Sequence, residues 1–111
     1  MPTKRLSCFE IGGITVVNMA HTPGFGDLEG DVRIDRASKW GNQFRMANDS
    51  EAERDRVCDA YSEWLEMRLR ESPDLLLPLM GARRLGCWCA PKRCHGESLA
   101  RAIVGERRRE G

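Results

Sequence analysis

Hydrophobic residues form short runs in the first third of the chain, and these runs predict strands. Residues 6–11 and 14–19 flank Gly12-Gly13, a pattern typical of a β-hairpin because a tight turn needs positive φ. The second run is β-branched and nearly continuous, which predicts a central, buried strand. Residues 31–35 alternate between polar and apolar side chains and predict a short edge strand.

The middle of the chain carries a helical pattern. Apolar side chains recur at three- and four-residue spacing from Val57 to Leu65, which predicts a long amphipathic helix that ends near Ser72-Pro73. Ser50 and Glu53 fit a capping box at its start, with the Glu53 side chain reaching back to Ser50. Ser72 is also placed to cap a second, short helix that Gly81 would end.

The last third predicts a strand over residues 84–89 and a helix over 97–108, followed by a charged tail, 106–111, that we expect to fray. This order of strands and helices predicts one α/β domain over residues 1–111. We expect a small, mixed, mainly parallel sheet flanked by helices in a Rossmann-like arrangement.

Composition narrows the class of protein. Hydrophobic residues make up 41% and charged residues 32%, an ordinary globular balance, and the net charge of +1 creates no global field for nucleic acid or membrane. The five cysteines form an odd set, a poor framework for disulfides. With no signal peptide and no long apolar run, the sequence predicts a cytoplasmic protein with reduced thiols and no membrane partner.

The most unusual segment runs from Cys87 to His95, between the last predicted strand and helix. Cys87 and Cys89 would share one face of the strand, with Trp88 on the other. Cys94, His95 and Gly96 would begin the helix, where unpaired N–H groups and the helix dipole favour an anion. The same field favours the thiolate form of a cysteine, and it is reinforced by two neighbouring cations, Lys92 and Arg93.

Three interpretations of this segment compete. In the first, Cys87, Cys89, Cys94 and His95 bind zinc, although they lack the two separated ligand pairs of a common zinc finger. In the second, Cys94 or His95 reacts with a ligand or contacts its anionic group. In the third, the cysteines are small buried hydrophobes and His95 caps the helix.

A second unusual segment, residues 38–44, joins a cation, a large ring, a glycine and two amides in a predicted loop. As a recognition loop, Trp40 would stack on a base, Lys39 would pair with phosphate and Asn42 would read a polar edge. As a structural loop, Trp40 and Phe44 would fill the core while Gly41-Asn42 makes a turn, and the spacing slightly favours this second interpretation.

Catalysis is a further option. His21 directly follows the predicted central strand, and loops at the carboxyl ends of parallel strands line the binding crevice, so His21 and Cys94 can meet there. Cys94 is the candidate nucleophile, and His95 or His21 is the candidate base. The sequence contains no recognisable triad or carboxylate pair, so it leaves open whether the protein is an enzyme.

The two unusual segments together resemble a small family of uncharacterised bacterial and phage proteins, a domain of unknown function. The matching parts are Val16-Val17-Asn18, residues 38–44 and residues 87–96, and the resemblance spans about 14–104. Gln43 stands where the family usually has proline, which should loosen the loop. The resemblance carries no established activity; occurrence in phages makes a nucleotide-related role in the host cytoplasm an expectation.

We therefore expect a pocket for a small phosphorylated or nucleotide-like ligand at the carboxyl edge of the sheet. The candidate binding residues are Asn18, Ser38, Lys39, Trp40, Gly41, Asn42, Lys92, Arg93 and Gly96. The alternative is a zinc-stabilised module that binds protein or nucleic acid through Cys87, Cys89, Cys94 and His95.

Overall fold

The computed structural model describes residues 8–90 and 92–110. Its four strands form one sheet in the order β1-β2-β4-β3, with β1 antiparallel to β2 and β4 parallel to both of its neighbours. The strand bounds are β1 (Cys8–Ile11), β2 (Ile14–Asn18), β3 (Asp31–Arg33) and β4 (Arg84–Cys87). The expected α/β class and the mixed, mainly parallel sheet are thereby confirmed.

The N-terminal hairpin is formed as predicted. Ile11 pairs with Ile14 across the turn, and Gly12 and Gly13 have φ values of 57° and 92°, which side-chain-bearing residues rarely adopt. β2 lies between β1 and β4, so the predicted central strand and the predicted edge strand, β3, are both confirmed.

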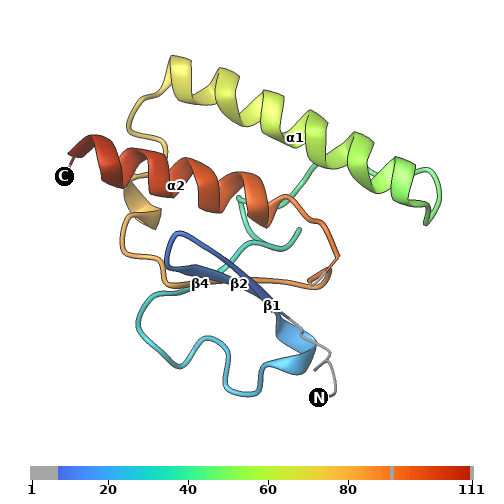
Figure 1. Ribbon diagram of the computed structural model, residues 1–111, viewed down its shortest axis with the longest axis horizontal. Helices are drawn as coiled ribbons and strands as arrows, with labels where there is room; N and C mark the ends of the chain where they lie inside the picture. Colours follow the sequence, from blue (N-terminus) through green and yellow to red (C-terminus); the bar gives the residue numbers. More distant parts are fainter. Residues whose placement is uncertain (1–7, 91, 111) are drawn as a thin grey trace.

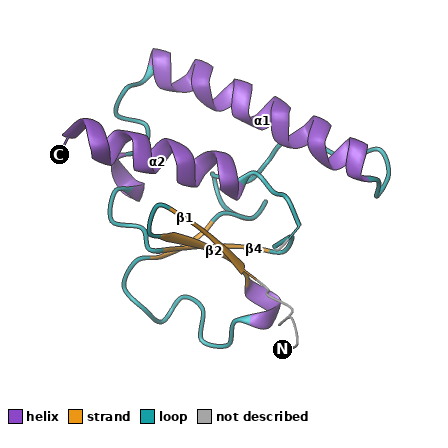
Figure 2. Ribbon diagram, viewed as in Figure 1, coloured by secondary structure: helices purple, strands orange, loops and turns teal. Residues whose placement is uncertain are grey.

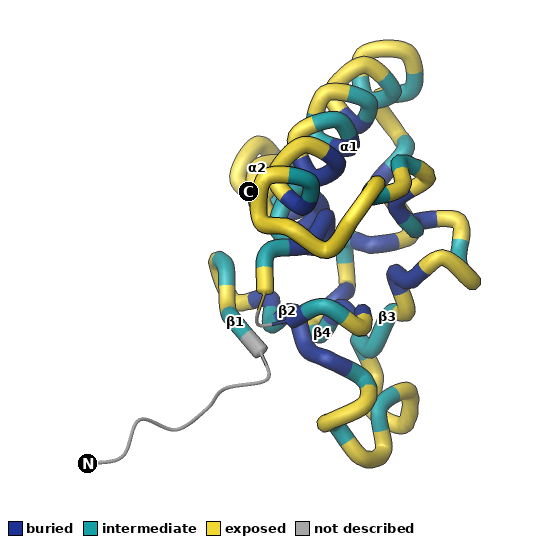
Figure 3. The backbone as a smooth tube through the Cα atoms, turned by 90° about the vertical axis from the view of Figure 1, so that its right-hand side faces the viewer, coloured by how far each residue is buried: buried dark blue, intermediate teal, exposed yellow. Residues whose placement is uncertain are grey.

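Both long helices, α1 (Glu51–Glu71) and α2 (Gly96–Glu110), lie on the same side of the sheet in two perpendicular views (Figure 1; Figure 3). On the other side, Figure 2 shows no long helix but a loop that follows the short 3-10 helix η1 (Met19–His21). A Rossmann-like arrangement with helices on both faces is therefore not confirmed.

The core lies between the sheet and the helices, where Figure 3 shows the buried segments. Val16 on β2, Leu85 on β4 and Ile103 on α2 are all 0% exposed. Helix α1 adds Tyr61 and Leu65, which share one face at helical spacing.

The loop on the opposite face is held by two contacts. A Cβ on Gly86 would lie 2.6 Å from the Phe25 ring, so only glycine lets that ring lie against β4. Asp31 accepts both hydrogen bonds of the Arg84 guanidinium at 2.7 Å and the N–H groups of Gly26 and Leu28. The hydrogen bonds with Arg84 have the largest effect, and together these bonds hold the pKa of Asp31 at about 2.

Helix α1 is capped differently from the prediction. The Glu53 N–H donates to Ser50 Oγ at 3.1 Å, as expected, but the Glu53 carboxylate does not reach back to Ser50. It accepts instead from the Ala47 N–H and the Arg56 guanidinium, and the chain bends at residues 47–49, directly before the helix. At the other end, the Ser72 N–H donates to Arg68 O, so Ser72 ends α1.

Several predicted segments have different bounds. The edge strand expected over 31–35 ends at Arg33, and residues 6, 7 and 111 of the predicted first strand and tail lie outside the described residues. The short helix expected after Ser72 is only the 3-10 helix η2 (Leu77–Leu79). The strand expected over 84–89 ends at Cys87. The tail expected to fray continues α2 to Glu110, because Arg107 donates to the carbonyl oxygens of Met80 and Ala82. Within the described ranges, neither helix is long and apolar enough to cross a membrane.

Replacing Leu85 by Ala should lower the free energy of unfolding by about 2–5 kcal/mol, because the cavity left at a fully buried position cannot collapse completely. The matched control is Leu77→Ala, which removes the same atoms from a side chain that is 59% exposed. Urea denaturation of both variants measures the difference, and equal losses would contradict this account of the core.

Candidate functional site

The segment between β4 and α2 is fixed by one side chain at the end of the central strand. Asn18 Nδ2 donates to the carbonyl oxygens of Trp88 and Ala90, each at 3.1 Å, and Asn18 Oδ1 accepts the N–H of Ala20 at 2.9 Å. The bonds to Trp88 and Ala90 direct the chain away from the sheet directly after Cys87. Asn18 is thus buried and fully used in shaping the site.

A cavity of about 360 Å³ lies beneath this segment, and we call it the cysteine cavity. It lies where α1, the segment 87–95 and the loop after β3 meet. Its walls combine thiols, aromatic rings and charged groups: Cys58, Cys87, Cys89, Cys94, Phe44, Trp88, Asp35, Arg36, Arg54 and Arg93. Such a mixture of apolar wall and few polar groups is typical of small-molecule sites.

Trp88 lines the same cavity as Cys87 and Cys89, instead of lying on an opposite face. It is 53% exposed, yet its indole N–H donates to Asp35 Oδ2 at 2.8 Å, which fixes the ring at the rim. Asp35 also accepts two bonds of 2.8 Å from Arg33. The hydrogen bonds from Arg33, and to a smaller extent the one from the indole N–H of Trp88, hold the pKa of Asp35 below its ordinary value.

The sulfur atoms are close together. Cys94 Sγ lies 3.5 Å from Cys87 Sγ and accepts the Gly96 N–H at 3.3 Å. Contact with Cys89 lowers the pKa of Cys87, but the Cys94 thiol and burial outweigh it and raise that pKa to about 11. Burial likewise raises the pKa of Cys58 to about 11. Cys58 and Cys87 are therefore neutral thiols near pH 7.

The start of α2 is more enclosed than the sequence suggested. The Gly96 N–H is already bonded to Cys94, and a Cβ on Gly96 would lie 2.9 Å from Val16 Cγ1 and 3.0 Å from Ile34 Cδ1. The expected anion contact at the Gly96 amide would therefore have to displace a sulfur acceptor inside the core.

His95 faces the core. Its Nε2 lies 2.7 Å from Ile34 O, and because a carbonyl oxygen only accepts, Nε2 carries the proton and donates it. The ring packs edge-on against Tyr61, with centroids 4.8 Å apart. Burial lowers the pKa of His95 below its ordinary value of 6.5, even though the carbonyls of Ile34 and Trp40 favour the charged form.

The orientation of His95 also affects whether it can bind zinc together with the cysteines. The sulfurs of Cys87 and Cys94 lie together, whereas the Nε2 of His95 is committed to Ile34 O. In residues 8–90 and 92–110, no three Cys, His, Asp or Glu side chains are arranged to hold a metal ion. The proposed ligand set Cys87, Cys89, Cys94 and His95 thus does not fit zinc in this arrangement.

The loop 38–44 is held by its own polar groups. Ser38 Oγ donates to Asp35 O and accepts the Trp40 N–H, while Asn42 Nδ2 donates to Val57 O and Asn42 Oδ1 accepts the Phe44 N–H. Trp40 is buried, and the Tyr61 hydroxyl donates to its carbonyl oxygen at 3.0 Å. Trp40 thus belongs to the hydrophobic core, the position that the structural interpretation of the loop predicts.

Steric crowding explains why position 41 of this loop is a glycine. A Cβ there would lie 2.6 Å from both Arg36 Cα and Asp35 O, so the loop closes tightly on the chain that leaves β3. Of the residues in this loop that were predicted to contact a ligand, only Lys39 is exposed. Its Nζ lies 5.0 Å from the centroid of the Trp40 ring.

Other predicted residues lie apart from the cavity or are already paired. His21 is exposed on η1 and is not among the cavity residues, so it does not meet Cys94. Lys92 is exposed and also does not line the cavity. Arg93 lines it, but its guanidinium binds Asp55 at 3.0 Å and Asp59 at 2.8 Å.

The sequence interpretation missed Arg36, Arg54 and Cys58 as cavity residues. Arg54 is buried on α1, and its single ion pair in the described ranges is with the exposed Asp49, at 3.3 Å. One signal was available: Arg54 lies on the same stripe of α1 as Val57, Cys58 and Tyr61, where a charged residue is out of place unless it serves a site.

Comparisons with known proteins agree with the range of the resemblance expected from the sequence, about residues 14–104. Residues 17–105 match a family described as "Domain of unknown function (DUF4326)". A protein of Enterobacteria phage T4, described as an uncharacterized 12.4 kDa protein in the nrdA-td intergenic region, is 33% identical over 76 residues, which covers 66% of this chain and 67% of the phage protein. No solved structure matches the chain.

Replacing Asn18 by Ala should lower the free energy of unfolding by about 1–3 kcal/mol, because the carbonyl groups of Trp88 and Ala90 lose their donor. It should also speed alkylation of Cys87 and Cys89, because the segment after β4 is released. Gln43→Ala, which removes an exposed amide, is the control. Timed iodoacetamide labelling read by peptide mass spectrometry measures the rates, and unchanged labelling in Asn18→Ala would contradict the role of Asn18.

The buried His95 should make stability depend on pH. Its folded-state pKa is lowered, so its contribution is complete above the ordinary value of 6.5 and is lost as pH falls toward the folded-state pKa, by at most about 1.4 kcal/mol per pH unit. Urea denaturation between about pH 7 and 5 should show this slope in the wild type and in His21→Gln, and a flatter one in His95→Gln. Equal slopes in all three proteins would show that His95 is not responsible.

Proposed function

The chain belongs to the family described as a domain of unknown function, DUF4326, and on that premise we propose that it binds a small, phosphorylated, nucleotide-like ligand in the cysteine cavity. The observation that carries the proposal is the buried guanidinium of Arg54, which lines the cavity and has one carboxylate partner in the described ranges, the exposed Asp49. A buried cation is costly unless it is well paired, and a bound anion would give Arg54 a second partner inside the cavity.

The arrangement of cations supports the same ligand class. Arg93 is neutralised by Asp55 and Asp59, so it contributes little attraction for an anion. Arg36 lines the cavity opposite α1 and forms no ion pair within the described residues; its Nε donates to Asn42 O at 3.3 Å. Arg36 and Arg54 are therefore the groups we expect to bind a phosphate, in place of the Gly96 amide.

Trp88 supplies a surface for the ring of the ligand. Its indole is anchored to Asp35 through Nε1 and remains 53% exposed, so a planar group can stack on it without first ordering the side chain. The cavity volume of about 360 Å³ lies within the range of small-molecule sites.

Catalysis is not part of this proposal. The Nε2 of His95 donates its proton to Ile34 O, so that nitrogen is not free to act as a base. Cys94 is 2% exposed, with its sulfur bonded to the Gly96 N–H. We propose binding, and assign Cys94 and His95 to the walls that shape the cavity.

Isothermal titration of the purified protein with the four ribonucleoside monophosphates tests the proposal. At least one should bind the wild type, and Arg54→Gln should weaken binding roughly tenfold or more, because a charged hydrogen bond contributes about 1.5–3 kcal/mol. Arg70→Gln, an exposed position on the same helix, is the control and should bind as the wild type does. Thermal melting of both variants checks that the fold is intact. Absence of binding to the wild type, or equal binding by Arg54→Gln, would refute the proposal.

A further inference from the structure

A second hollow, of about 570 Å³, lies beside the cysteine cavity and has a strongly cationic lining. Three of its lining residues, Arg36, Lys39 and Arg45, carry positive charge, and none of its lining residues carries a carboxylate. Trp64 forms an aromatic part of the wall. We call this the cationic hollow.

The two hollows are neighbours. Arg36 and Asn42 line both of them, so a ligand that extends out of the cysteine cavity past Arg36 enters the cationic hollow. Asn42 is fixed between them by its bonds to Val57 and Phe44, so the wall they share is rigid.

The positive charge of the cationic hollow is not neutralised within the described part of the chain. Arg36, Lys39 and Arg45 form no ion pair there, whereas nearby Arg56 pairs with Glu53 at 2.8 Å. Lys39 Nζ lies over the Trp40 ring, a contact that leaves its N–H groups available to an anion.

The groove between α1 and α2 shows the opposite arrangement. It also holds three cations, Arg93, Arg101 and Arg109, but each pairs with a carboxylate of α1 or α2. Although the chain as a whole carries a net charge of +1, three cations that form no ion pair in the described residues, Arg36, Lys39 and Arg45, lie together where the loop 38–45 borders the cysteine cavity. Local surplus charge of this kind attracts phosphates.

We propose that the protein binds single-stranded nucleic acid, with one nucleotide in the cysteine cavity and the adjoining phosphates in the cationic hollow. The inference rests on the proposed function, because the cavity supplies the site for the base. Arg36 and Arg54 bind the phosphate of the nucleotide in the cavity. Lys39 and Arg45 bind the phosphates that follow it in the strand. A cationic surface that adjoins aromatic side chains is the usual means of holding a single strand without reading its sequence.

The test compares ligand lengths. Titrations of the wild type with a thymidine mononucleotide, tetranucleotide and octanucleotide should show affinity rising with length. The logarithm of the binding constant for the octanucleotide should fall with the logarithm of salt concentration between about 50 and 200 mM, with a slope near −2 for three neutralised phosphates at about 0.7 each.

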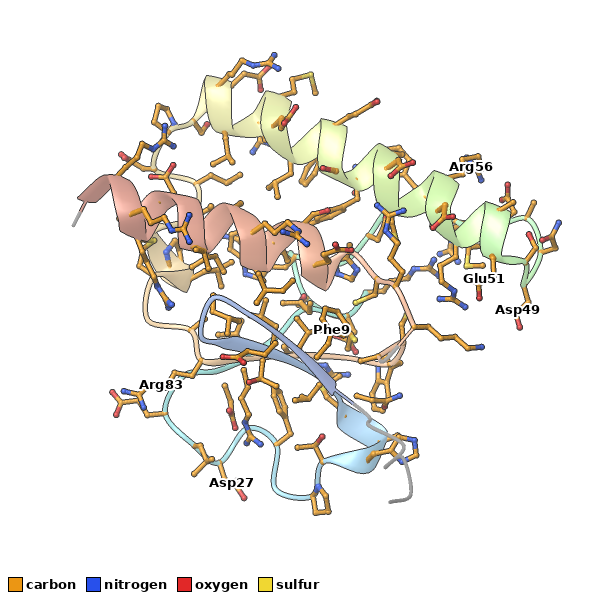
Figure 4. All side chains as sticks on the ribbon, in the orientation of Figure 1. Phe9, Asp27, Asp49, Glu51, Arg56 and Arg83 are labelled. Atoms are coloured by element: carbon orange, nitrogen blue, oxygen red, sulfur yellow. The ribbon has the colours of Figure 1, made fainter. Side chains whose placement is uncertain are left out.

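The double variant Lys39→Gln/Arg45→Gln should weaken octanucleotide binding roughly tenfold or more at low salt and reduce the slope by about 1.4, with mononucleotide binding unchanged. The control, Arg70→Gln/Arg83→Gln, removes the same charge from exposed positions outside both hollows. Figure 4 shows Arg83 far from Asp49 and Arg56, which mark the N-terminal end of α1.

The outcomes separate the two proposals. Equal affinity for the mononucleotide and the octanucleotide, unaffected by the double variant, would overturn the strand inference and leave the nucleotide cavity standing. Octanucleotide binding that depends on Lys39 and Arg45 but not on Arg54, with no mononucleotide binding, would overturn the cavity and retain the strand site. Equal binding of a polyglutamate peptide of the same length would overturn the inference in favour of an acidic partner.

Discussion

The amide of Asn18 is the interaction on which the rest of the site depends. It donates to two carbonyl oxygens of the segment after β4 and accepts an N–H of η1, so it joins two chain segments at one end of the sheet. Only a side chain with both donors and an acceptor can do this, since a carboxylate would face two carbonyl oxygens without a proton to offer. The position of Trp88, and with it the rim of the cysteine cavity, follows from these bonds.

Pairing of charges decides which cations remain available. Half of the arginines of α1 and α2 pair with a carboxylate three or four residues away on the same helix, and they are neutralised there. Residues 36–45 of the loop after β3 contain no carboxylate, and Asp35, just before them, is already occupied by Arg33 and Trp88. Arg36 and Lys39 therefore keep their charge, and the loop that holds Trp40 in the core also presents those cations to solvent.

Much of the fold could be predicted from local patterns. The hairpin at Gly12-Gly13, the central strand and α1 follow from turn chemistry and periodicity, both of which act over a few residues. The cysteine segment attracted attention as a candidate site because of its position between a strand and a helix, and it does line the cysteine cavity. The orientation of His95 was not predictable, because it depends on Ile34 O and Tyr61, which are remote in sequence. Arg54 was missed because its role appears only when α1 packs beside the segment 87–95.

The bonds of Asn18 to Trp88 and Ala90 span 70 and 72 positions of the chain, and this has a consequence for the order in which the molecule folds. The contacts within the hairpin β1–β2 and within helix α1 are local in sequence, but the cavity forms only when β4 docks between β2 and β3. Closing so long a loop is slow compared with forming a turn or a helix. On a ribosome, the site is therefore completed only after the chain as far as His95 has emerged, so a nascent chain that ends before the segment 87–95 lacks it.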